Sequence, residues 1–368
     1  MNTTPLHVAH QAHGAKLVDF AGWSMSLHYS GVIDEYKAVR HQAGLFDVSH
    51  MGRITISGNG ALPFLQFVTT NDVAQLQVNR SQYSMVCNPK GGVKDDVFLY
   101  RLGVQEYLLC VNASNHNKIF EWLHEVKHQV TEPFDIKDRS EEMAQVALQG
   151  PSSKMILLAA LNVDITPIPP RGCLPTTFLN DPLLITRTGY TGEIGVELYL
   201  SSSHVKSLWD RLIEIGTTHG LKPAGLGARD LLRLDMGYFL YGNELTEETT
   251  PVEAGAEWVV DFQKDHFIGS SILVKQREEG PPRRLIAFEL VAKGVPRHGM
   301  GMYAEDRCIG EVTSGNLSPI LQKGVGLGYV SSEFSDSGNS LSIDIRGKRM
   351  AANLVNPPFY KRRAGNPS

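Results

Sequence analysis

The sequence has 368 residues, with 35 Lys and Arg against 39 Asp and Glu, a formal net charge of −4, and 42% hydrophobic residues. This length predicts two or three domains able to bury their own cores, and the weakly negative charge disfavours nucleic acid or an anionic membrane as a partner. Because the four cysteines form no Cys-x-x-Cys pair, no apolar run approaches the ~20 residues of a membrane span, and no leader-like segment opens the chain, we expect a cytoplasmic, soluble protein.

The first 280 residues alternate between helix-like and strand-like patterns. Periodicity and capping residues predict helices at 5–16, 30–44, 60–69, 114–129, 204–216 and 227–237. Alternation predicts strands at 53–58, 82–88, 96–102, 106–112, 144–150 and 182–189. In the second helix we expect Gly44 to act as the stop. Hairpins mixed with helices indicate an α+β fold rather than a doubly wound parallel sheet.

A turn-rich, charged segment, EEGPPRR (278–284), marks a change in the pattern. After it come short strands separated by Gly, Ser and Asp turns, which are typical of a small all-β barrel or sandwich. We therefore expect a domain boundary near residue 280, with one region at 1–279 and an all-β domain at 280–364.

The segment NPKGGVKDDVFLY (88–100) places two carboxylates where a strand begins. Adjacent strand residues point to opposite faces, so Asp95 and Asp96 should not share one environment. An inward carboxylate is costly unless it is paired or used. Asp is also common in turns, and the pattern alone favours that structural role for either residue.

Glu197 lies in RTGYTGEIGVEL (187–198), on an otherwise apolar strand. It is either a surface or edge residue, which the pattern alone favours, or an inward acceptor. Two acceptor oxygens on one carboxylate suit an aminopyrimidine edge with adjacent N–H groups.

Arg229 lies in PAGLGARDLLRLDMG (223–237), in the first turn of a predicted helix. A cation gains nothing from the helix dipole at that end, which suggests another purpose for Arg229. The GLGARD segment lacks the third glycine and the preceding strand of a dinucleotide fingerprint, which disfavours a Rossmann site.

Two polar clusters offer further alternatives. In GLFDVSHMG (44–52), the residues Asp47, Ser49 and His50 suggest a hydrolytic triad, but they are too close in one segment, and a turn held by side-chain hydrogen bonds is favoured. The histidines at 7, 10 and 13 lack partner ligands nearby, so we expect an exposed helical face rather than a metal site.

In their order along the chain, these segments resemble the glycine cleavage T-protein family. The match runs nearly end to end, from TPLHVAHQAHGAKLVDFAGW (4–23) to PPFYKRR (357–363). Between them lie GLFDVSHMG, QYSMVCN, GGVKDD, ALQGP, RTGYTGE, PAGLGARD, YGNELTEETTPVEAG, FIG, RHG and EVTSGNLSPIL. Single pieces are weak signals, whereas the ordered set is specific.

The resemblance implies a three-domain cloverleaf around a central folate channel. Residues 1–279 would form two intertwined α+β subdomains, the second at roughly 53–140, and 280–364 a β-barrel. It also implies a metal-free aminomethyltransferase of glycine catabolism and one-carbon metabolism. Such an enzyme moves a one-carbon unit from the aminomethyl-lipoyl arm of H-protein to tetrahydrofolate. The products are 5,10-methylene-tetrahydrofolate, ammonia and dihydrolipoyl H-protein. A monomer that meets H-protein transiently is expected.

The resemblance also assigns roles to individual residues. Asp96, the second carboxylate of GGVKDD, would be catalytic, and Glu197 would bind the pterin. Arg229 matches the arginine of the GARD motif. The remaining expected folate-contacting residues are Tyr83, Asn112, Tyr190, Tyr360 and Arg362. Of these, the tyrosines at 83 and 190 would contact rings, and Arg362 suits a carboxylate by charge.

Two departures from the family pattern and two rival functions accompany this interpretation. Ile194 replaces a usual acidic residue beside the expected folate loop, and PIPPRGCL (167–174) stands where an aromatic residue is often found. One rival is another tetrahydrofolate-dependent demethylase of this fold, acting on dimethylsulfoniopropionate or a methylamine. The other is a non-catalytic folate-binding factor for iron–sulfur assembly, which is disfavoured because TTPVEAG (249–255) lacks the cysteine of that group.

Overall fold

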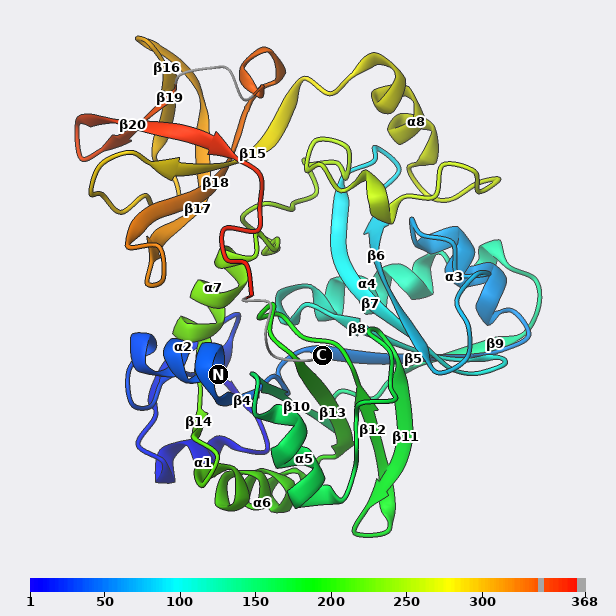
Figure 1. The fold of residues 1–368 in the computed structure, drawn as a ribbon. Coiled ribbons are helices and arrows are strands. Elements are labelled where there is room, and N and C mark those ends of the chain that lie inside the picture. Colours follow the sequence, from blue (N-terminus) through cyan, green and yellow to red (C-terminus); the bar gives the residue numbers. More distant parts are fainter. Residues whose placement is uncertain (337–340, 363–368) are drawn as a thin grey trace.

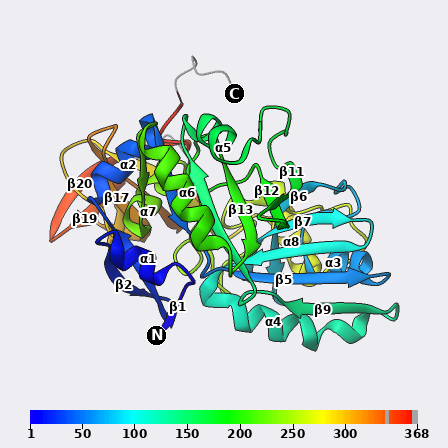
Figure 2. The ribbon, with the colours of Figure 1, turned by 90° about the horizontal axis from the view of Figure 1, so that it is seen from below.

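Three sheet-based parts surround a common centre in this computed structural model, which describes residues 1–336 and 341–362 (Figure 1). Strands within each part pair mostly antiparallel, and helices pack on the sheets of the first two parts (Figures 1 and 2). The fold is therefore the expected α+β cloverleaf. Among the described residues, no helix combines the length and apolar character that a membrane crossing requires.

The first part is a six-stranded sheet with helices on both faces. Its strand order is β11 (Cys173–Phe178), β12 (Asp181–Thr186), β13 (Gly195–Ser201), β10 (Met143–Gln149), β4 (Ala43–Asp47) and β14 (Leu221–Pro223). One face packs on α1 (His7–Ala12), α5 (Ser153–Leu161) and α6 (Val205–Thr217), around the fully buried Trp209. The other packs on α2 (Val32–His41) and α7 (Leu226–Asp235). Glu197 consequently lies on a central strand, between β12 and β10.

The second part is a five-stranded sheet. Its order is β6 (Arg80–Cys87), β7 (Val93–Gly103), β8 (Glu106–Val111), β5 (Gly52–Gly58) and β9 (Phe134–Asp138). The meander predicted from 82 to 112 is confirmed, since β6, β7 and β8 are sequential antiparallel neighbours. Helices α3 (Ala61–Val68) and α4 (His116–Glu125) cover the face that carries its apolar core.

The third part is a closed six-stranded barrel, as expected for the C-terminal region. Its strands are β15 (Arg283–Leu290), β16 (Gly301–Ala304), β17 (Arg307–Ser318), β18 (Lys323–Ser331), β19 (Leu341–Ile345) and β20 (Lys348–Val355). Phe288, Met302, Val312 and Ile343 fill its interior. Residues 363 and 364 of the expected domain lie outside the described residues.

Several boundaries differ from the sequence-based predictions. Gly44 does not stop a helix, because α2 ends at His41 and Gly44 lies inside β4, where an added Cβ would meet a Val39 methyl at 2.4 Å. The segment at 278–284 is less irregular than expected, because α8 (Ser270–Glu279) runs into it and β15 begins at Arg283. The N-terminal strands β1 (Asn2–Thr3), β2 (Lys16–Phe20) and β3 (Trp23–His28), and helix α5, were not predicted.

The prediction that the histidines of α1 form an exposed face is wrong for His10. This residue is fully buried, and its ring nitrogens lie 2.8 Å from Asp47 Oδ2 and 2.9 Å from Tyr29 Oη. The hydroxyl of Thr4 also donates to Asp47. The turn interpretation of GLFDVSHMG is confirmed, since the Ser49 amide donates to Asp47 Oδ1 at 2.9 Å.

Arg40 joins elements from distant parts of the chain. Its guanidinium is buried and forms ion pairs with Glu193 at 2.8 Å and Asp235 at 3.1 Å. The guanidinium carbon of Arg40 lies 4.1 Å from the ring centroid of Tyr360, which belongs to the C-terminal tail. One side chain of α2 therefore connects the loop before β13, the end of α7 and the tail.

Replacing Arg40 should destabilise the protein strongly, because Arg40→Met leaves two buried carboxylates without their cation. Breaking a buried ion pair from one side costs roughly 3–5 kcal/mol. Denaturant unfolding followed by circular dichroism measures this loss. The matched control is Arg139→Met, since Arg139 pairs with Glu142 at the surface, where a pair contributes about 0–1 kcal/mol. Equal losses for both variants would contradict the role of Arg40.

Candidate functional site

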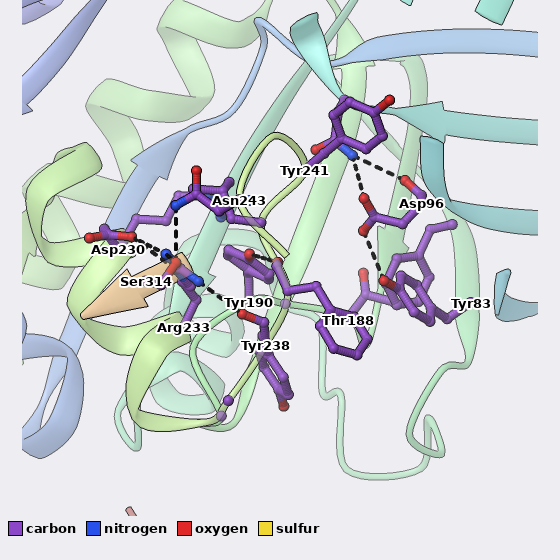
Figure 3. Close-up of a pocket in the computed structure, with 18 of the residues that line it drawn as sticks. Tyr83, Asp96, Thr188, Tyr190, Asp230, Arg233, Tyr238, Tyr241, Asn243 and Ser314 are labelled. Carbon is purple, nitrogen blue, oxygen red and sulfur yellow. Dashed lines mark hydrogen bonds and ion pairs between the residues drawn. The ribbon is translucent and has the colours of Figure 1, made fainter. Parts of the chain in front are cut away.

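A cavity of about 1190 Å³ lies where the three parts meet. Its wall includes Tyr83 of β6, Glu197 of β13, Arg229 of α7 and Ser314 of β17, so every part contributes. Figure 3 shows Tyr83 and Ser314 among the lining residues. Pockets for one small molecule usually measure about 300–1,000 Å³. This cavity therefore has room for a ligand and for part of a second reactant.

Asp96 presents a carboxylate to this cavity from β7. Its Oδ2 accepts a hydrogen bond from the Tyr83 hydroxyl at 2.9 Å (Figure 3). Its Oδ1 accepts one from Asn112 Nδ2 at 2.8 Å. Burial raises the pKa of Asp96 above its ordinary value, while the two donors act in the opposite direction. Asp96 is thus a fixed carboxylate with increased affinity for a proton.

Asp95 points to the other face of the same strand, as alternation predicts. It is fully buried, whereas Asp96 is half-buried at the cavity wall. Neither carboxylate closes the preceding turn, so the turn role favoured by the pattern is wrong. That turn is held by Asn88, whose Oδ1 accepts the amides of Lys90 and Gly92 at 2.9 and 3.1 Å.

Glu197 faces inward, which corrects the surface role that its pattern favoured. The side chain is buried in the cavity wall. Its Oε1 accepts a hydrogen bond from Gln145 Nε2 at 3.2 Å, and its Oε2 accepts one from the Thr188 hydroxyl. Each oxygen has a further lone pair for a ligand donor.

Aromatic rings and cations line the wall near α7. Tyr190 stacks with Tyr238, with ring centroids 5.7 Å apart and an interplanar angle of 26°. The Arg229 guanidinium carbon lies 4.6 Å from the Tyr190 ring centroid, on the cavity side of α7. Arg233, one turn later, pairs with Glu244 at 3.1 Å and Asp230 at 2.8 Å (Figure 3). A flat ligand with an anionic group suits such a wall.

The cavity brings together all of the predicted site residues except Tyr360. The predicted residues found in its lining are Tyr83, Asp96, Asn112, Tyr190, Glu197, Arg229 and Arg362. The Tyr360 ring instead lies against Arg40. Both departures from the family pattern also reach the wall, through Ile194 and through Pro170 and Arg171 of the 167–174 segment.

Trp258 is the principal wall residue that sequence reasoning missed. It lies in a 3-10 turn at Glu257–Val259, remains 58% exposed and stacks on Tyr83 with ring centroids 5.6 Å apart. The Arg171 guanidinium lies 5.9 Å from its ring centroid. No motif surrounds Trp258, so only the tertiary structure relates it to Asp96. Gln145 and Tyr238 were also missed, and so was Thr188, although it lies inside the segment RTGYTGEIGVEL that sequence reasoning singled out.

His50 lines the cavity but does not belong to a triad. Asp47 is bonded to Thr4, His10 and the Ser49 amide rather than to His50. Burial lowers the pKa of His50 to about 3, so the ring is neutral near pH 7. The hydrolytic alternative is therefore wrong.

Known proteins match this chain over nearly its whole length. The model of the GCVT N-terminal domain matches residues 6–264, and that of the glycine cleavage T-protein C-terminal barrel domain matches residues 283–361. An aminomethyltransferase of Halothermothrix orenii is 45% identical, over 98% of this chain and 100% of the relative. An aminomethyltransferase of Desulforamulus reducens is also 45% identical, over 98% and 99% of the two chains.

A solved structure has the same fold. The crystal structure of glycine cleavage system aminomethyltransferase T from Bartonella henselae superposes with a TM-score of 0.92. It is 33% identical, and the match covers 98% of this chain and 99% of that one. The two domain models, the full-length relatives and this structure agree with one another. The chain belongs to the glycine cleavage T-protein family.

Proposed function

We propose that this chain is the aminomethyltransferase of a glycine cleavage system. It transfers the one-carbon unit of an aminomethyl-lipoyl H-protein to tetrahydrofolate, giving 5,10-methylene-tetrahydrofolate, ammonia and dihydrolipoyl H-protein. One observation carries the proposal. A carboxylate of raised proton affinity, Asp96, and an inward acceptor, Glu197, line the same large cavity. The full-length relatives named aminomethyltransferase support it.

We propose that Glu197 binds the pterin of tetrahydrofolate. The pterin carries adjacent N–H groups on one edge, and Glu197 has two oxygens, each with free acceptor capacity. Gln145 and Thr188 donate to those oxygens, which fixes the plane of the carboxylate. Tyr190, with Arg229 against its ring, supplies a flat surface for the ligand rings.

The anionic glutamate end of the folate needs cations, and Arg362 meets this requirement. Its exposed side chain lies in the cavity wall, and Arg187 is close enough for the two charges to interact. Two neighbouring guanidinium groups repel each other unless an anion lies between them. Tyr360 would act indirectly, because its ring packs on Arg40 and so anchors the tail that carries Arg362.

Asp96 is proposed to act on the folate amine. When ammonia leaves the aminomethyl thioether, the carbon becomes cationic, and the amine attacks it with loss of a proton. A fixed carboxylate orients the amine, stabilises the positive charge and accepts that proton. The second folate amine then attacks the same carbon as the carbon–sulfur bond breaks. This closes the 5,10-methylene bridge, and the proton of that amine goes to the departing sulfur, which releases the dihydrolipoyl arm. H-protein would therefore dock transiently at the cavity mouth of a monomeric enzyme.

The direct test mixes the protein with aminomethylated H-protein and tetrahydrofolate. We expect ammonia and 5,10-methylene-tetrahydrofolate in equal amounts, with folate-dependent release of the lipoyl thiols. Dimethylsulfoniopropionate and methylamines, offered as alternative donors, should give no product. Turnover of one of those donors, without turnover of aminomethyl-H-protein, would replace the proposed function by a demethylase.

Removing the proposed base should abolish most activity without unfolding the protein. We expect Asp96→Asn to lower kcat by roughly 10²–10⁴-fold, the usual contribution of general acid–base catalysis. The matched control is Asp135→Asn, a carboxylate exposed to solvent on β9 of the same sheet. Single-turnover rates and thermal unfolding measure the two effects. Full activity of Asp96→Asn at normal stability would exclude the proposed role.

Changing the proposed pterin acceptor should weaken folate binding. Glu197→Gln keeps the shape but removes the charge and one acceptor oxygen, and a hydrogen bond to a charged group contributes about 1.5–3 kcal/mol. The Kd for tetrahydrofolate should therefore rise roughly tenfold or more. Titration calorimetry measures it, with the exposed Glu142→Gln as control. An unchanged Kd would remove Glu197 from the pterin site.

A further inference from the structure

A second carboxylate, Asp95, lies behind the proposed base and does not reach the cavity. Its side chain is fully buried on the face of β7 that also carries Val93 and Val97. Nothing in the proposed reaction uses it. A buried carboxylate among apolar neighbours is costly, so its presence requires an explanation.

Three N–H groups converge on Asp95. Its Oδ2 accepts the Asn112 amide at 2.9 Å. Its Oδ1 accepts Asn112 Nδ2 at 2.8 Å and Asn115 Nδ2 at 2.6 Å. All of these donors are neutral, and among residues 1–336 and 341–362 Asp95 forms no ion pair. Among the described residues, the fold thus supplies hydrogen bonds to both oxygens of Asp95 but no cation.

The Asn112 side chain bridges the two carboxylates. Its Nδ2 lies 2.8 Å from Asp95 Oδ1 and 2.8 Å from Asp96 Oδ1. An amide nitrogen has two hydrogens, so one can go to each carboxylate. Asp95 also binds the main-chain N–H of Asn112. The rotamer in which Asn112 donates to Asp96 is therefore held from behind by Asp95.

We infer that Asp95 is a positioning residue, which orients the Asp96 carboxylate through the Asn112 amide. This inference rests on the proposed catalytic role of Asp96. It gives a function to Asp95, which contacts neither substrate. It also explains why the fold keeps two adjacent carboxylates on opposite faces of one strand.

The electrostatics of the pair agree with this geometry. Burial, and after it the charge of Asp96, raises the pKa of Asp95 to about 8. Burial also raises the pKa of Asp96. Two carboxylates that share a site cannot both ionise freely, and they titrate as a pair. The pair therefore retains a proton at a higher pH than an isolated aspartate, which favours proton transfer near neutrality.

The surroundings of the pair add acidic groups rather than cations. The charge of Asp95 raises the pKa of three neighbouring groups, which are Tyr83 of β6, Cys110 of β8 and Tyr241 of the loop after α7. The charge of Glu244 raises the pKa of Asp96. The neighbouring Lys94 and Lys118 are each paired with Glu247, at 3.5 and 3.1 Å. On α4, His116 pairs with Asp138.

The kinetic test is the pH profile of Asp95→Asn. Below about pH 8 the proton of the pair stays on Asp95, so Asp95→Asn should keep the acidic limb of kcat and remove the inflection that Asp95 contributes near pH 8. Because Asn112 is then no longer held against Asp96, kcat should fall by about tenfold, with KM for tetrahydrofolate unchanged. Asp135→Asn should keep the parent profile. A profile identical to the parent's, or an effect on KM alone, would overturn the inference.

A titration without turnover separates this inference from the proposed function. The full chain, labelled with ¹³C at the aspartate carboxyls, is titrated by NMR as parent and as Asp96→Asn. Asp95 should titrate at least one unit lower in the variant, because its charged neighbour is gone. Identical Asp95 titrations in the two proteins would refute the coupling, even if Asp95→Asn does not fold. A coupled pair in a protein that transfers no aminomethyl group would instead refute the proposed function alone.

Discussion

The alternation of side chains along β7 determines how this site is built. A strand points neighbouring residues to opposite faces, so Asp95 and Asp96 enter different surroundings although they adjoin in sequence. Asp95 joins the apolar face under α3 and α4, and Asp96 joins the cavity wall. Asn112 follows β8, which pairs with β7 in antiparallel register, and so its amide reaches both. A slip of one residue in this pairing would bury Asp96 and turn Asp95 towards the cavity.

The cavity exists only because three parts meet, and polar side chains fix that meeting. Glu244 is fully buried and accepts hydrogen bonds from Arg233 of α7, at 3.1 Å, and from the Thr313 hydroxyl of β17, at 2.6 Å. In the same way, the Arg40 side chain connects α2 with α7 and with the tail. Directional bonds of this kind set the relative orientation of the parts, which apolar packing alone specifies less sharply. The distance between Asp96 and Glu197 thus depends on residues that touch neither.

The sequence predicted local features well and spatial relations poorly. The meander at 82–112 and the C-terminal barrel strands have clear alternation and turn residues, and both were found. The roles of Asp95 and Asp96 were not separable by pattern, because Asp is common at turns and only the family resemblance selected Asp96. Glu197 looked like a surface residue until β13 proved to be a central strand. Trp258 has no local signal at all, since its relation to Tyr83 arises only in the folded chain.

The departure at Ile194 is compatible with the site for a physical reason. The backbone carbonyl of Ile194 accepts the Gly150 amide at 2.7 Å and the Ser153 hydroxyl at 3.2 Å, so any side chain could keep the loop in place. Its neighbour Glu193 is already neutralised by Arg40. An acidic side chain at 194 would add an unpaired charge to a wall that holds Glu197. An apolar residue there leaves Glu197 as the acceptor on that stretch of the wall, which suits a ligand that offers N–H donors at one end and carries its negative charge at the other.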